Sequence, residues 1–204
     1  MKISTASTTA SSEGVLSAIA SSDTSRSNTL RSNTSRPDAS PADIASEIIT
    51  LKAQPISSEA FAPFGQVIWP QSDEVPFGPQ DAQLELSKGT PRFYIMQLHQ
   101  RGRRFTNITK HMGCTQCLGS LGGETWFLGV AAPCDRTSPT LDEITVFEIP
   151  GHCFVKLHVG TWHAGPYFDA KTVNFYNLEL SDTNVVDHTT CDLVQTYGTA
   201  FEIV

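Results

Sequence analysis

Beyond Thr90 the chain alternates between short runs of apolar, β-forming residues and short clusters of turn residues. Runs of five to nine residues that are bounded in this way are typical of β-strands. The pattern therefore predicts an all-β domain. Its expected strands are residues 92–98, 104–109, 114–118, 124–131, 144–149, 153–158 and 172–180.

The region before these strands is less regular. Four further elements are expected: a strand over 48–53, a helical turn over 57–61, a strand over 64–69 and a helical turn within 139–143. Ser57 is a typical N-cap for the first helical turn. Residues 70–90 have no sustained period and predict a long surface loop. The Leu121-Gly122-Gly123 and Pro150-Gly151 segments are each expected to close a hairpin between the flanking runs.

The run over 124–131 is apolar on both faces. Trp126, Leu128 and Val130 alternate with Phe127 and Ala131. Because neighbouring side chains of a strand point to opposite sides, this strand is expected to be buried on both. The sequence therefore predicts a sandwich or barrel with a covering layer, which is either another sheet or a partner subunit.

The composition changes near residue 43. Residues 1–43 consist mainly of Ser, Thr and Ala, which is typical of a disordered segment. Three arginines among the hydroxyl residues also fit an organelle transit peptide, although three acidic residues argue against import. We therefore expect a tail over 1–43, either plainly disordered or an import signal, followed by one domain over 44–204.

Charge and cysteine content narrow the class of protein further. The formal net charge is −7, and no basic cluster is long enough to follow a nucleic-acid backbone. The short run from Arg101 to Arg104 is most simply a solvated turn, with an anionic-substrate site as the alternative. No apolar run is long enough to span a membrane. Five cysteines without a secretory signal favour reduced thiols in an intracellular, cytoplasmic protein.

Two segments that begin 47 residues apart share one layout of polar groups. In each, a histidine is followed two places later by glycine and five places later by a second side chain with a lone pair. On a regular strand, residues five apart face opposite ways, but a glycine between them can host a bulge or a tight bend. We therefore expect four side chains to converge on one interior: His111, Gln116, His158 and His163.

Three imidazoles and an amide support two kinds of site. They could bind a divalent first-row metal, or they could transfer protons and orient a small polar molecule without any cofactor. Trp162 is expected to wall the pocket or to fill the core, and the favoured interpretation is a position that does both. Lys110 and Lys156 are the nearest cations that could hold a substrate carboxylate.

Other histidines and cysteines are given no chemistry. Cys114 and Cys117 have the CxxC spacing of zinc and redox sites, but residues three apart on a strand face opposite sides and no second pair completes a zinc site. Both thiols are therefore expected to be small core residues. The remaining histidines lie near predicted loops: His99, His152 and His188.

Residues from about 51 to 192 resemble the ureidoglycolate lyase family of the cupin superfamily. The matching passages are AQPISSEAFAPFGQVI, ITKHMGCTQCLGSLGGETWFLGVA and VKLHVGTWHAGPYF. The Thr-Gln pair after the first histidine and the HxxxWH pattern of the last passage are recurrent in that family. The HxH motif and distant Glu of metal-binding cupins are missing.

This resemblance implies a double-stranded β-helix, a homodimer, and release of urea from ureidoglycolate to leave glyoxylate, in allantoin and purine breakdown. The residues that match the family motifs are His111, Gln116, His158, Trp162 and His163. Two positions depart from the family pattern. Ala164 stands in place of a second histidine, and Thr109 stands in place of an acidic residue, while Lys110 after it keeps the positive charge.

These roles define the site hypothesis. His163 would act as base and His158 as acid, or the reverse, while His111 and Gln116 orient the substrate and Lys110 or Lys156 holds its carboxylate. One alternative is a cupin that binds a small carboxylate metabolite, such as glyoxylate, or a metal without turnover. Another is a metal-dependent cupin oxidoreductase or isomerase, which the absent HxH disfavours.

Overall fold

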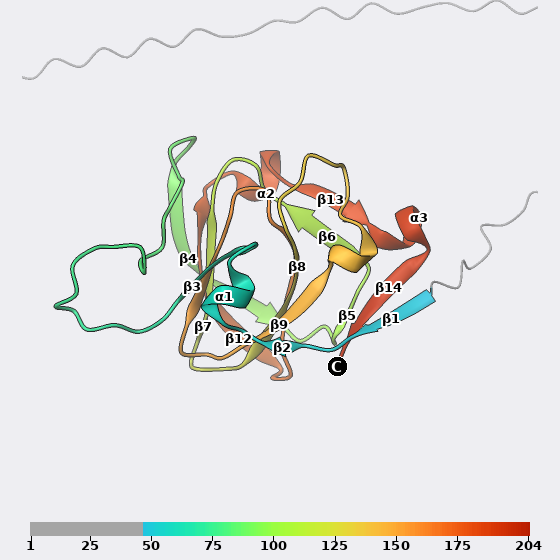
Figure 1. Ribbon diagram of the computed structural model, residues 1–204, viewed down its shortest axis with the longest axis horizontal. Helices are drawn as coiled ribbons and strands as arrows, with labels where there is room; N and C mark the ends of the chain where they lie inside the picture. Colours follow the sequence, from blue (N-terminus) through green and yellow to red (C-terminus); the bar gives the residue numbers. More distant parts are fainter. Residues whose placement is uncertain (1–46) are drawn as a thin grey trace, which may run out of the picture. The chain divides into compact units, whose positions relative to one another are not determined.

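The computed structural model describes residues 47–204 (Figure 1). The expected tail over 1–43 lies outside the described residues. The described chain forms three sheets, two large and one small, and its helices are short. The prediction of an all-β domain is therefore confirmed.

Each sheet is assembled from strands distant in the sequence. The five-stranded sheet has the order β3 (Gly65–Ile68), β10 (Phe154–Leu157), β7 (Gln116–Leu121), β12 (Thr172–Leu180) and β4 (Pro91–His99). The six-stranded sheet has the order β13 (Thr189–Asp192), β6 (Asn107–Lys110), β11 (Trp162–Tyr167), β8 (Trp126–Ala131), β9 (Thr145–Ile149) and β2 (Gln54–Pro55). The small sheet has the order β1 (Glu47–Leu51), β14 (Thr199–Ile203) and β5 (Arg104–Phe105).

The helices are α1 (Ser58–Phe61), the 3-10 turn η1 (Leu141–Glu143), α2 (Thr183–Val186) and α3 (Leu193–Tyr197). Ser57 caps α1, as expected, because its side chain accepts a hydrogen bond from the Ala60 amide at 3.1 Å. The predicted loop over 70–90 contains no helix or strand. Figure 1 shows it reaching away from the sheets between β3 and β4.

The chain crosses repeatedly between the two larger sheets, as in a double-stranded β-helix. Strands β7 and β8 belong to different sheets, and so do β9 and β10. The two expected hairpins are therefore wrong. Their glycines instead let two crossings pack together, since a side chain at Gly151 would lie 2.0 Å from the Gly123 carbonyl carbon. Within the described residues, no ladder joins the larger sheets, so the expected barrel is not closed.

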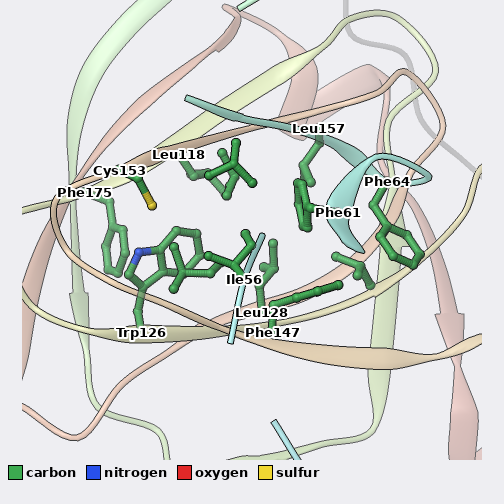
Figure 2. Packing of buried hydrophobic residues seen from close by; sticks show 14 of the residues in the cluster. Ile56, Phe61, Phe64, Leu118, Trp126, Leu128, Phe147, Cys153, Leu157 and Phe175 are labelled. Carbon is green, nitrogen blue, oxygen red and sulfur yellow. The ribbon is translucent and has the colours of Figure 1, made fainter. Parts of the chain in front are cut away.

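Strand β8 separates two hydrophobic clusters. Trp126, Leu128 and Val130 belong to one cluster, which lies between the larger sheets (Figure 2). Phe127 and Ala131 face the second cluster, which includes residues of β14 in the small sheet. The prediction that this strand is buried on both faces is confirmed, and the small sheet supplies the covering layer.

The last forty residues contain structure that the pattern did not predict. The Gly165-Pro166 pair lies inside β11, where the register against β8 shifts between Ala164 and Tyr167. Strand β14, the last of the chain, pairs in parallel with β1, the first strand of the described residues. No helix among the described residues is long and apolar enough to cross a membrane.

Candidate active site

A cavity of about 600 Å³ is lined by strands of both larger sheets. Strands β4, β7 and β12 contribute from the five-stranded sheet, and β6 and β11 contribute from the six-stranded sheet. Three of the four expected side chains line it: His111, Gln116 and His163. The cavity is large enough for a small metabolite.

The two echoed segments are both crossings between the larger sheets. In the first crossing, His111 directly follows β6 and Gln116 begins β7. In the second crossing, His158 directly follows β10 and His163 lies in β11. Because β6 pairs with β11 and β7 pairs with β10, the two crossings are neighbours. The Gly160 amide donates a hydrogen bond of 2.7 Å to the His111 carbonyl and joins them.

Glycine has a different purpose in each crossing. Gly160 has a φ of +82°, the left-handed region that favours glycine. Position 113 needs glycine for a different reason, because the Asp187 carboxylate lies close to it. A Cβ atom at Gly113 would lie 2.8 Å from a carboxylate oxygen of Asp187. Both glycines therefore shape the bends on which the expected convergence depends.

Asp187 holds the first crossing in place. Its carboxylate accepts hydrogen bonds from the amides of Met112 at 2.7 Å and Gly113 at 2.5 Å. Its backbone carbonyl faces Nδ1 of His111. Because a carbonyl can only accept, Nδ1 of His111 carries the hydrogen, and in the neutral ring Nε2 keeps its lone pair.

His163 is the histidine whose protonation is most perturbed. Its Nδ1 donates to the Thr161 carbonyl at 3.2 Å, which leaves Nε2 as the free nitrogen. Burial, assisted by the nearby His111, lowers the pKa of His163 to about 4. The ring centroids of these two histidines are 5.1 Å apart. At neutral pH, His163 is therefore an uncharged imidazole with an available lone pair.

His158 does not line the cavity. It borders a narrow void behind it, together with His111, Gln116 and His163. Lys156 Nζ lies 3.1 Å from Nδ1 of His158, and Nε2 lies 3.2 Å from the Ala62 carbonyl. Burial and the Lys156 charge lower the pKa of His158. Both ring nitrogens already have protein partners, so the expected acid role does not fit its position.

Neither lysine reaches the cavity. Lys110 Nζ donates to the carbonyls of Cys134 at 3.1 Å and Arg136 at 3.2 Å and lies 4.6 Å from the Trp162 ring centroid. Lys156 is buried beside His158, and this burial lowers the pKa of its amine. The prediction that Lys110 or Lys156 holds a substrate carboxylate therefore does not agree with their positions.

Trp162 is fully buried in the second hydrophobic cluster rather than in the cavity wall. The reason is strand alternation. His163 lies opposite Thr109, and both side chains line the cavity. Trp162 and Lys110, one residue away on the same two strands, face the other side. Trp162 therefore fills the core, and the favoured position in which it also walls the pocket is not observed.

Several cavity residues were missed by the sequence analysis. His188 lines the cavity, with its ring centroid 5.5 Å from that of His111. Asn177 and Glu179 point inward from β12, on the strand face that also carries the buried Val173 and Phe175, so polar residues on an otherwise apolar face were a usable signal. Arg101 and Arg104 also line the cavity, which favours the anionic-substrate alternative for that run.

The expected four-residue metal set does not fit this arrangement. All four expected side chains border the narrow void behind the cavity, but both ring nitrogens of His158 are already engaged by Lys156 and the Ala62 carbonyl. Within residues 47–204, no group of three or more His, Cys, Asp or Glu side chains has a geometry that could hold a metal ion. His111, Gln116 and His163 are therefore better suited to hydrogen bonding and proton transfer.

The fold and the cavity define a double-stranded β-helix protein with a histidine-lined site between its sheets. The model of the ureidoglycolate lyase family matches residues 48–197. The chain therefore belongs to the ureidoglycolate lyase family, as the sequence motifs indicated. The description of that family, ureidoglycolate lyase, names an enzyme activity.

Other comparisons are more distant. No curated protein matches the chain. Among solved structures, the chain is similar to oxalate decarboxylase, in a structure described by its substrate binding mode and a reaction specificity switch. That match has a TM-score of 0.35 and 11% identity, and it covers 62% of this chain and 38% of the other. The chain thus spans little more than a third of that protein's length.

Proposed function

We propose that this protein releases urea from ureidoglycolate and leaves glyoxylate. The observation that carries the proposal is the uncharged His163 imidazole, whose Nε2 is free of protein partners in a cavity of about 600 Å³. The family match supports the class of reaction. The proposed chemistry needs a group that takes up a proton and then returns it, and Nε2 of an uncharged imidazole can do both.

The proposed step moves one proton between two atoms bound to the same carbon. Nε2 of His163 takes the proton of the carbinol hydroxyl, and a carbon–oxygen double bond forms as the carbon–nitrogen bond breaks. The electron pair of the broken bond leaves on the urea nitrogen, which takes the proton from the imidazolium. A low pKa favours this second transfer, because the imidazolium gives up its proton readily.

The substrate carboxylate needs a cation, and Arg101 and Arg104 are the arginines that line the cavity. The Arg104 guanidinium already forms an ion pair with Glu202, with a nitrogen–oxygen distance of 3.6 Å. Arg101 has no carboxylate partner among the described residues. We therefore propose that Arg101 takes the role expected of Lys110 or Lys156, since a guanidinium can bind a carboxylate through two parallel hydrogen bonds.

The proposed step draws on side chains alone, so we propose that turnover requires neither a metal nor another cofactor. The test is an assay of the purified full-length protein with racemic ureidoglycolate, following glyoxylate, urea and ammonia, with and without a chelator. Equal amounts of glyoxylate and urea, unaffected by the chelator, are expected. Ammonia in place of urea would indicate hydrolysis of the ureido group and would overturn the proposal.

A second candidate is binding of a small carboxylate metabolite, such as glyoxylate, without turnover. Its specific support is that Thr109 and Ala164, the positions that depart from the family pattern, both line the cavity. The same assay separates the two functions. A rise in melting temperature with glyoxylate, in a protein that produces no urea, would favour the binding function.

The expected homodimer stays a prediction.

A further inference from the structure

One end of the cavity is organised around a buried carboxylate. Glu179 is 0% exposed, and its oxygens accept hydrogen bonds from Gln116 Nε2 at 2.9 Å, Asn184 Nδ2 at 3.0 Å and Tyr94 Oη at 3.2 Å. No lysine or arginine in the described part of the chain pairs with it. A buried charge without a countercharge costs free energy. Packing alone therefore does not account for Glu179.

Glu179 sets the direction of the surrounding hydrogen bonds. A carboxylate can only accept, so the Gln116 amide must turn its NH₂ group toward it. The second hydrogen of that NH₂ goes to Asn177 Oδ1 at 3.2 Å. Asn177 is oriented in turn, because its Nδ2 donates at 3.0 Å to Tyr94 Oη, which itself donates to Glu179. One carboxylate thereby fixes three side chains.

The consequence is an end of the cavity that offers acceptors. Gln116 Oε1 is buried and has no hydrogen-bond partner among residues 47–204. His111 and His163 each direct Nδ1–H to a backbone carbonyl, so each ring, in its neutral form, presents an Nε2 lone pair. Buried acceptors are nearly always paired in folded proteins. A ligand that completes this end must therefore bring hydrogen-bond donors.

We propose that Glu179 is a specificity-determining residue, which fixes the Gln116 amide so that this end of the cavity selects ligands rich in N–H and O–H donors. A ureido group next to a carbinol hydroxyl fits this description, because it presents the N–H hydrogens of both nitrogens together with the O–H. The identity of the ligand rests on the proposed function. The donor selectivity rests on the hydrogen-bond network itself.

The strand register also gives the ligand a direction. In the ladder between β12 and β4, Glu179 pairs with Arg92 and Thr172 pairs with His99. Arg101 follows His99 by two residues, so it lies beyond the opposite end of the ladder from Glu179. The ureido group would therefore point toward Glu179 and the carboxylate toward Arg101, with the carbinol carbon near His163.

The test measures binding rather than turnover. Ureidoacetate lacks the carbinol hydroxyl and cannot react, and its terminal N,N-dimethyl analogue also lacks the NH₂ donors. We expect the wild-type protein to bind ureidoacetate roughly tenfold more tightly by calorimetry, because the analogue leaves buried acceptors unpaired. Glu179→Gln is expected to reduce this preference to about threefold or less, since a glutamine amide permits the Gln116 amide to flip.

Two further variants keep the inference falsifiable. Asn184→Ala removes one donor to Glu179 from an exposed residue, so folding is expected to survive and the preference to fall partway. Gln97→Ala is the control, because Gln97 is exposed and bonds Asn174 outside the network. An unchanged preference in both Glu179→Gln and Asn184→Ala would overturn the inference.

Failure of the inference and failure of the proposed function are distinguishable. Equal binding of both analogues by a wild-type protein that still forms urea from ureidoglycolate would overturn the donor selectivity and leave the reaction standing. Binding of neither analogue, with no urea formed, would overturn both. A retained preference for ureidoacetate without turnover would support the selectivity and contradict the lyase reaction.

Discussion

The two crossings between the larger sheets have the same spacing of polar groups and different outcomes. The first crossing presents both His111 and Gln116 to the cavity, whereas the second presents only His163. His158 lies in the second crossing at the place that His111 holds in the first, but its nitrogens face Lys156 and Ala62. A repeated spacing thus predicts where a side chain starts, and the local partners decide where its polar atoms point.

The largest expected effect is a difference in activity between variants of the two histidines of the second crossing. His163→Ala is expected to lower kcat/KM for ureidoglycolate by about 10²- to 10⁴-fold, because the proton-transfer group is lost. His158→Ala is expected to lower it by less than about tenfold, because that ring has no free nitrogen for the substrate. Steady-state kinetics on both variants, with His152→Ala as a control beside Trp69, measure the difference. Equal losses in the two crossings would contradict the assignment.

The second prediction concerns Asp187, whose carboxylate holds the first crossing in place. Asp187→Ala removes the acceptor for two amides, so His111 is expected to move and kcat/KM to fall by roughly 10- to 100-fold. Asp182→Ala is the matched control, because Asp182 lies at the other end of α2 and its side chain makes no capping hydrogen bond within the described residues. If Asp187→Ala retains the full rate, the carboxylate does not position the crossing.

The third effect sharpens the contrast through pH. The folded pKa of His163 is about 4, below the unfolded value of 6.5, so the unfolded state takes up the proton first as the pH falls. Its contribution to stability is therefore complete above pH 6.5 and is lost as the pH falls toward 4. Denaturant unfolding across this range should show a smaller pH dependence for His163→Asn than for the wild type. His158→Asn should remove a smaller share.

The smallest effect concerns Lys156, which lies in β10 just before the second crossing. Lys156→Met is expected to change the free energy of unfolding by less than about 1 kcal/mol, because a buried amine without a carboxylate contributes little net stability. Turnover should be unchanged, and the pKa of His158 should rise, because the nearby positive charge that lowers it is gone. Histidine ring NMR titration measures that pKa. A strong loss of turnover would instead support the original prediction that Lys156 binds the substrate carboxylate.

Most of the fold follows from patterns along the chain. The two apolar faces of β8, the Ser57 cap of α1 and the strand over 172–180 were all predictable from local sequence. The supposed hairpins were not, because Gly-Gly and Pro-Gly turns look the same whether the next strand pairs with the previous one or enters another sheet. Sheet membership depends on long-range pairing that local residues do not encode.

The site was predictable where the motif lies on a crossing and not where it depends on distant partners. His111, Gln116 and His163 follow from the repeated spacing, and all three line the cavity. Lys110 was wrongly expected at the substrate because one residue along a strand reverses the side of the sheet. Asp187 and His188 reach the cavity region from a loop more than seventy residues away. No local pattern connects that loop to the first crossing.

The 2.7 Å bond from the Gly160 amide to the His111 carbonyl couples the lengths of the two crossings. An insertion or deletion in one would pull its tip away from the other unless the partner changed by a matching amount. Among related chains, we therefore expect the two loops to gain or lose residues together. A chimera that exchanges only one of them should fold less stably than a chimera that exchanges both.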